Sequence, residues 1–144
     1  MKWFTIDELC YSATANAKGI SNVPTADVKK RLELLVSEVL DPVREAFGKP
    51  IIVNSGYRSE RLNKAIGGAK KSQHLRGEAV DVRAKNPSDN KVIFDIVAQL
   101  GKYDQLIWEL GNDLFPAWVH FSYREPMRKQ ILRTKDGKSY TKIK

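Results

Sequence analysis

The chain has 144 residues, of which 42% are hydrophobic and 29% charged, and Cys10 is its single cysteine. This composition is typical of one folded domain, and it excludes a disordered chain, a two-domain protein and an internal disulfide. The net charge of +8 indicates attraction to polyanions such as nucleic acid, anionic membrane or acidic cell-wall polymer, but it does not indicate an activity.

The first half of the chain is dominated by one helical pattern. From Thr25 to Phe47 the apolar residues recur at steps of three and four, which predicts an amphipathic helix. Asp41-Pro42 interrupts the pattern, so we expect a kink there, with Asp41 as the N-cap of a restarted helix. A short strand in KPIIVNSGYRS and a short helix in SERLNKAIGG follow.

The second half predicts strands around one helix. EAVDVRA, YDQLIWEL and AWVHFSYR read as strands, and PSDNKVIFDIVAQLG reads as a capped amphipathic helix. Asp136-Gly137 lies between two β-rich runs and predicts a hairpin. The sequence therefore predicts a single α+β domain over residues 1–144, with an antiparallel sheet flanked by helices.

The chain has two histidines, His74 and His120, and neither lies where a structural histidine is a good explanation. Strand alternation places His120, and likewise Asp81, on the face opposite its apolar neighbours. Gly77 lets the chain turn back, so that His74 and Asp81 converge. Taken alone, this pair is more often a hydrogen-bonded surface pair. Together with His120 it forms an N,N,O site that suits zinc with a fourth position open to water.

Three segments resemble one family. SQHLRGEAVD matches the S-x-H-x-x-G-x-A-x-D signature of a zinc metallopeptidase family that includes D-alanyl-D-alanine carboxypeptidases, D-Ala-D-Ala dipeptidases and phage endolysins. VNSGYRS and WVHFSY also resemble this family, and they occur in the right order. The resemblance implies the fold shared with the hedgehog signalling domain, Zn²⁺ as cofactor, and hydrolysis of peptide bonds in peptidoglycan stem peptides.

The resemblance also implies a role for each matching residue. The three expected zinc ligands are His74, Asp81 and His120. Arg58 matches an arginine that meets the carbonyl or carboxylate of the substrate, with a structural salt bridge as the alternative. Ser72 matches a serine at the substrate pocket, and the alternative is a turn or capping hydroxyl. Gln73 is expected to contact the substrate or the water on the metal.

The catalytic base departs from the common pattern. Many members carry a glutamate three residues before the last histidine, where this chain has Ala117. The resemblance to short members of the family implies a base on the preceding strand, which makes Glu109 the candidate and Asp113 the alternative. If both acids are only solvated charges, the expectation of a hydrolase fails.

Two other classes of function fit parts of the sequence. One is a non-catalytic zinc-containing cell-wall binding module, although no spare cysteine or histidine is present to close a structural zinc site. The other is a nucleic-acid-binding protein, but the aromatic residues are not interleaved with the basic ones. We therefore expect a monomer whose partner is a peptidoglycan peptide, with no specific nucleic-acid partner.

The location is predicted from the same features. No apolar run is long enough to span a bilayer, and MKWFTIDELCYS lacks the apolar segment of an export signal. Small size and a basic surface favour a phage or prophage lysin, or an accessory wall enzyme, present in the cytoplasm and acting on the cell wall. The residues leave open whether the bond cut is D-Ala–D-Ala, as in a carboxypeptidase, or L-Ala–D-Glu, as in an endopeptidase.

Overall fold

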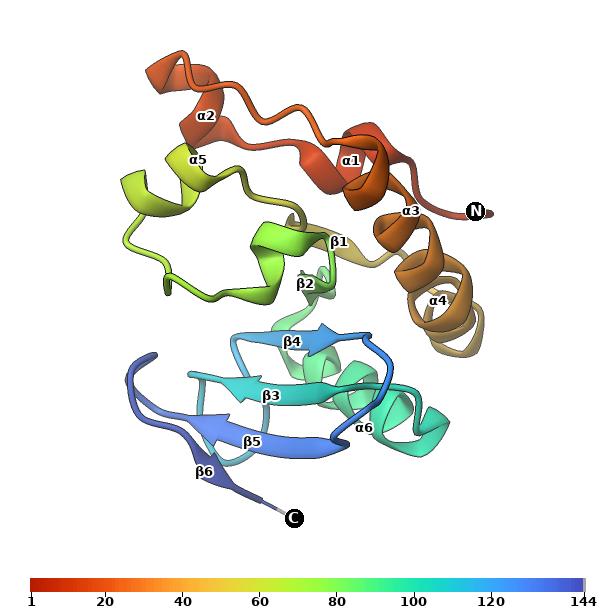
Figure 1. Ribbon diagram of the computed structural model, residues 1–144. Coiled ribbons are helices and arrows are strands. Elements are labelled where there is room, and N and C mark those ends of the chain that lie inside the picture. The colour runs from red at the N-terminus through yellow and green to blue at the C-terminus, as the bar shows by residue number, and fades with distance from the viewer. Residues whose placement is uncertain (144) are drawn as a thin grey trace.

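A computed structural model describes residues 1–143, which form a six-stranded sheet with helices packed against it (Figure 1). The strands are β1 (Ile52–Ser55), β2 (Ala79–Arg83), β3 (Gln105–Glu109), β4 (Trp118–Ser122), β5 (Gln130–Thr134) and β6 (Thr141–Lys142). Their order across the sheet is β1-β2-β4-β3-β5-β6. The α-helices are α1 (Ile6–Cys10), α2 (Ala13–Lys18), α3 (Ala26–Leu35), α4 (Asp41–Phe47), α5 (Glu60–Ala65) and α6 (Asn90–Leu100).

The sheet is mostly antiparallel, as predicted, and one of its strand pairs is parallel. Neighbouring strands are antiparallel except for β3 and β5, which are parallel. Both edges of β4 are occupied, by β2 and β3, and the chain that leaves β4 adds to the free edge of β3. It reverses direction on the way, and β5 therefore runs parallel to β3. The α+β class itself is confirmed.

The helical segment predicted from Thr25 to Phe47 is present, but Asp41 does not cap its second part as predicted. A π-helical turn, Val36–Leu40, joins α3 to α4. Pro42 lacks an N–H and would crowd the carbonyl one turn earlier in a regular α-helix, and the wider π turn gives it room. Asp41 is itself helical and caps no helix. Its carboxylate accepts the backbone N–H groups of Lys2 at 2.7 Å and Trp3 at 3.0 Å, so it anchors the N-terminal segment.

The two faces of the sheet have different roles. Helices α3, α4 and α6 pack against one face, where the buried apolar side chains of β2, β3 and β4 complete the core: Val80, Val82, Leu106, Trp108, Val119 and Phe121. The opposite face carries the alternate side chains, including Asp81, Ile107 and His120, and it opens into a cleft of about 630 Å³. The alternation predicted for these strands is confirmed, because neighbouring residues on a strand point to opposite faces.

The predicted hairpin at Asp136-Gly137 also forms, and β5 and β6 pair antiparallel on either side of it. Asp136 Oδ1 accepts the backbone N–H groups of Lys138 and Ser139, each at 2.8 Å. The hairpin lies beside the cleft, which Gly137 and Tyr140 help to line. Within residues 1–143, no helix is long and apolar enough to cross a membrane.

Candidate metal centre

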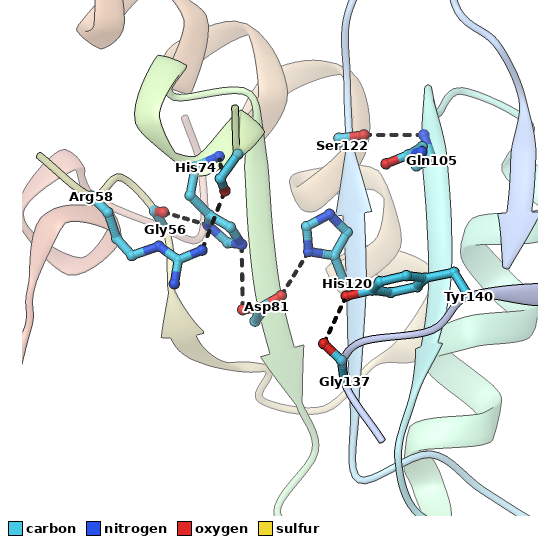
Figure 2. A network of polar contacts seen from close by, with 10 residues as sticks. Gly56, Arg58, His74, Asp81, Gln105, His120, Ser122, Gly137 and Tyr140 are labelled. Atoms are coloured by element: carbon cyan, nitrogen blue, oxygen red, sulfur yellow. Dashed lines mark hydrogen bonds and ion pairs between the residues drawn. The ribbon is translucent and has the colours of Figure 1, made fainter. Parts of the chain in front are cut away.

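The three predicted ligands meet at the centre of the cleft face (Figure 2). Asp81 on β2 lies directly across from His120 on β4, and the distance from Asp81 Oδ1 to His120 Nδ1 is 2.9 Å. His74 reaches the same carboxylate from its turn, with 3.3 Å between its Nε2 and Asp81 Oδ2. One ligand atom from each residue lies within 4.8 Å of the other two. The convergence predicted from the spacing is therefore present.

Two glycines place His74. It lies in the 3₁₀ turn Gln73–Arg76, which ends at Gly77 in the left-handed region with φ of 75°. A Cβ on Gly77 would lie 2.9 Å from Cγ1 and from the carbonyl oxygen of Val28 on α3, so only glycine fits this reversal. The ring is oriented by its Nδ1–H, which donates to the carbonyl oxygen of Gly56 at 2.7 Å. The turn therefore presents Nε2 to the cleft.

The charges at the centre are those a metal requires. Burial lowers the pKa of His74 and keeps its imidazole neutral, although Asp81 opposes this effect. Burial also acts to raise the pKa of Asp81, but the electrostatic influence of His74 and the hydrogen bond with His120 outweigh it and hold that pKa well below its usual range. A neutral imidazole and an ionised carboxylate are the forms in which these side chains bind metals.

The donor set fits a divalent metal such as zinc. A carbonyl oxygen can only accept a hydrogen bond, so the proton of neutral His74 is on Nδ1 and the Nε2 lone pair faces the Asp81 carboxylate. Such an arrangement is unfavourable unless a cation lies between the two groups. Hydrogen bonding of the remote ring nitrogen to a backbone carbonyl is also the usual support for a metal-binding histidine. We conclude that these residues form a candidate zinc site open to the cleft.

Arg58 and Ser72 both line the cleft, and Figure 2 shows Arg58 at one side of the metal centre. Arg58 Nη2 donates to Ser72 Oγ at 3.3 Å, and its backbone N–H donates to the carbonyl of His74 at 3.0 Å. No carboxylate within residues 1–143 forms an ion pair with Arg58, so the salt-bridge alternative is not observed. Ser72 Oγ also accepts from the backbone N–H of His74 at 3.2 Å, and it therefore both lines the cleft and caps the turn.

Gln73 lines the cleft, as expected, but its amide group is turned toward a network that the sequence did not indicate. Its Nε2 donates to Asp104 Oδ2 at 3.0 Å, whereas its Oε1 is buried and has no hydrogen-bond partner within residues 1–143. Gln73 therefore links the His74 turn to Asp104, at the start of β3.

The structure distinguishes the two candidate bases by position. Glu109, at the end of β3, is 8% exposed and lines the cleft. Burial raises its pKa to about 7, His120 opposes this rise and Asp81 adds to it. Asp113 instead pairs with Arg133 at 2.8 Å, has an 86% exposed side chain and does not line the cleft. Of the two acids, only Glu109 can reach a reacting group in the cleft.

Several cleft residues were not anticipated from the sequence. Trp118 lines the cleft with an indole N–H that is buried and unpartnered within residues 1–143. Tyr140 and Arg128 line it from the C-terminal segment. Strand alternation does place Trp118 on the face of His120, which was a usable signal. No local signal places Arg128 or Tyr140 there, because their positions depend on where β5 joins the sheet.

Comparison with known proteins gives a consistent result. A segment of 46 residues is 48% identical to the zinc D-Ala-D-Ala carboxypeptidase of Streptomyces albus G, and the match covers 31% of this chain and only 18% of that protein. The crystal structure of the Serratia marcescens L-Ala D-Glu endopeptidase ChiX overlaps 70% of this chain and 89% of its own, with a TM-score of 0.45 and 19% identity. The model of the peptidase M15 family matches residues 2–122, most of the chain. This protein therefore belongs to the peptidase M15 family.

Proposed function

We propose that the protein is a zinc-dependent peptidase that hydrolyses peptide bonds in peptidoglycan stem peptides, either as a D-Ala-D-Ala carboxypeptidase or as an L-Ala–D-Glu endopeptidase. The observation that carries this proposal is the Asp81 carboxylate, hydrogen-bonded to His120 and facing His74, in a cleft that also contains a buried acid and a half-buried arginine. The Streptomyces albus G relative is a zinc D-Ala-D-Ala carboxypeptidase, which supports this proposal.

Each cleft residue has a chemical task in this proposal. When bound, zinc supplies an acidified water and polarises the carbonyl of the scissile bond. Glu109 accepts the proton of the attacking water on its carboxylate and passes it to the leaving nitrogen, a task that a pKa near neutrality suits. Arg58 donates to the carbonyl oxygen as negative charge develops there.

The alternative is a cell-wall binding module that keeps zinc only for structure. A structural zinc site is closed by four protein ligands and does not need a general base beside it. Here the three candidate ligands face a cleft of about 630 Å³, and Glu109 is buried at its edge at an electrostatic cost. The arrangement favours catalysis over the binding module.

One experiment tests the proposal and identifies the bond. Purified protein with a measured metal content is incubated with peptidoglycan, with and without a chelator, and the released fragments are analysed by mass spectrometry. We expect chelator-sensitive release of either D-alanine or a peptide that begins with D-glutamate. Binding to the wall without release of any fragment, in a protein that contains zinc, would establish the binding module instead.

A further inference from the structure

One wall of the cleft lies outside the region that the family model matches. The match ends at residue 122, yet Arg128, Leu132, Gly137 and Tyr140 all line the cleft. They come from the connection after β4 and from the β5–β6 hairpin, which extends the sheet beyond β3 (Figure 1). The family match therefore does not account for the chemistry of this wall.

Arg128 is held in this wall by a buried carboxylate. Asp104 is fully buried, and it accepts from Arg128 Nη2 at 2.6 Å, from Nε at 3.0 and 3.2 Å, and from the backbone N–H at 2.8 Å. It also accepts from Gln73, which adjoins His74. A guanidinium that is already fixed in this way loses little conformational entropy when it binds a ligand.

Asp104 engages only part of the guanidinium. Arginine has five N–H donors in a planar fork, and Asp104 takes the one on Nε and one on Nη2. The donors on Nη1 have no partner within residues 1–143, and the side chain is 49% exposed where it lines the cleft. One of these N–H groups and the remaining N–H of Nη2 point the same way and suit a second carboxylate, which would lie at the end of the guanidinium, next to the edge that Asp104 occupies.

The charges of the cleft point to the same class of ligand. Arg58, Lys71 and Arg128 line it, and the acids that line it, Asp81 and Glu109, both lie at the metal centre. A bound divalent metal would add further positive charge there. Asp104 offsets the charge of Arg128, but Arg58 and Lys71 have no carboxylate partner within residues 1–143, so the cleft keeps positive charge and favours a peptide that carries carboxylates over one that carries amides.

We propose that Arg128 binds a carboxylate of the peptide substrate and thereby selects peptides in which that carboxylate is free. This inference rests on the proposed peptidase function and deepens it. A stem peptide carries two backbone carboxylates of this kind: the α-carboxylate of its γ-linked D-glutamate and the carboxylate at its C-terminus. Both present the same chemistry to Arg128, and the experiment separates them.

The first arm of the test uses the zinc-loaded wild-type protein. Three synthetic pentapeptides, L-Ala–γ-D-Glu–L-Lys–D-Ala–D-Ala, its D-glutamate α-amide and its C-terminal amide, differ in one carboxylate each. We expect one amide to show roughly 10–100-fold lower kcat/KM, the loss of one charged hydrogen-bonded contact, and that amide identifies the group bound. Equal kcat/KM for all three peptides overturns the inference and leaves the peptidase function intact. Cleavage of no peptide and no peptidoglycan overturns the proposed function as well.

The second arm assigns the selectivity to Arg128. Arg128→Lys can still pair with Asp104 but lacks the further N–H groups of the guanidinium fork. We therefore expect the ratio of kcat/KM for the free-acid peptide to kcat/KM for the amide peptide to fall to within about threefold of one. Arg128→Gln removes the charge and is expected to do the same, with zinc content and thermal unfolding measured to show that it folds. Arg124→Gln is the matched control, because Arg124 is an exposed arginine of the same connection that does not line the cleft. It should keep the wild-type ratio, whereas a wild-type ratio in Arg128→Lys overturns the inference.

Discussion

At the scale of single residues, Asp81 holds the candidate site together. Its two carboxylate oxygens face different histidines, Oδ2 toward His74 and Oδ1 toward His120. Without a metal, the lone pair of His74 Nε2 faces the half-buried Asp81 carboxylate and has no favourable partner. This arrangement is costly unless a cation binds, so the site is prepared for a metal before the metal arrives.

The first prediction follows from that arrangement. Wild-type protein should bind about one zinc per chain, and His74→Ala or His120→Ala should lose it, because two ligands hold zinc far more weakly than three. Metal analysis after dialysis measures this directly. Gln105→Ala is a suitable control, since Gln105 lines the same cleft but belongs to no metal-ligand group. Full zinc content in both histidine variants would contradict the ligand assignment.

The second prediction concerns Arg58. We expect Arg58→Ala to lower kcat/KM on the order of 10²–10³-fold with zinc content unchanged, because a preorganised donor to the developing oxyanion is lost. Arg58→Lys should recover little of this, since an ammonium does not reproduce the planar fork. Steady-state kinetics with zinc analysis measures both effects. If Arg58→Ala instead lowered the melting temperature sharply and left the activity of the folded fraction intact, Arg58 would be structural.

The third prediction separates the two acids. Glu109→Gln should keep zinc and fold normally, yet lose about 10²–10⁴-fold in peptide cleavage, the usual contribution of a general base. Asp113→Asn should retain wild-type turnover, because Asp113 is exposed and paired with Arg133 away from the cleft. Turnover of both variants on the same peptide makes the comparison. The opposite pattern would move the base to Asp113 and would require the loop that carries it to close over the cleft.

At the scale of elements, the site depends on how closely the His74 turn approaches α3. The turn can reverse at Gly77 only because the absent Cβ leaves room for Val28. Gly48, at the end of α4, has nearly the same φ, 73° against 75°, but nothing lies within 4 Å of the position that a Cβ would take. The two glycines share a conformation and differ in their surroundings.

The fourth prediction uses this pair. Gly48→Ala should cost only the strain of a left-handed alanine, about 1 kcal/mol of unfolding free energy. Gly77→Ala should cost about 2–4 kcal/mol, because it adds a clash with α3 to the same strain. It should also weaken zinc binding by displacing His74. Urea unfolding and zinc titration of the two variants test this, and equal effects would show that the contact with Val28 is unimportant.

At the scale of the whole molecule, the sheet separates stability from function. One face buries the apolar core beneath α3, α4 and α6, and the other holds buried or half-buried charges that contribute to no core. Glu109 is the clearest case, because burial raises its pKa to about 7. The folded protein therefore holds a proton on Glu109 that the unfolded chain releases at lower pH.

The fifth prediction concerns the pH range over which the burial of Glu109 lowers the stability of the protein. Below about pH 4 Glu109 is protonated in both the folded and the unfolded protein, and its burial does not lower the unfolding free energy. As the pH rises to about 7 the unfolded protein releases this proton first, so the metal-free wild type loses stability. Relative to wild type, Glu109→Gln should therefore gain about 2 kcal/mol of unfolding free energy between pH 4 and pH 8. Denaturant unfolding of both metal-free proteins at the two pH values measures the change. A difference that does not vary with pH would show that Glu109 is not desolvated.

Much of the site could be predicted from the sequence because the patterns that indicate it involve residues close together in the chain. Strand alternation alone places Asp81, Glu109 and His120 on the face away from the core, and a glycine that follows His74 indicates a reversal. The order of these segments within the family motif then predicts a shared metal. Each of these inferences uses neighbouring residues, whose geometry the backbone determines without reference to distant contacts.

Only the tertiary structure determines the features that depend on which segments of the chain pack against each other. Asp41 reads as a helix cap, yet it binds the N-terminus, because that segment offers it two free backbone N–H groups. The parallel pairing of β5 with β3 follows from which sheet edge was free, and that pairing brings Arg128 into the cleft and onto Asp104. The spacing of residues in the sequence does not indicate these contacts and pairings, since they depend on how segments far apart in the chain pack together.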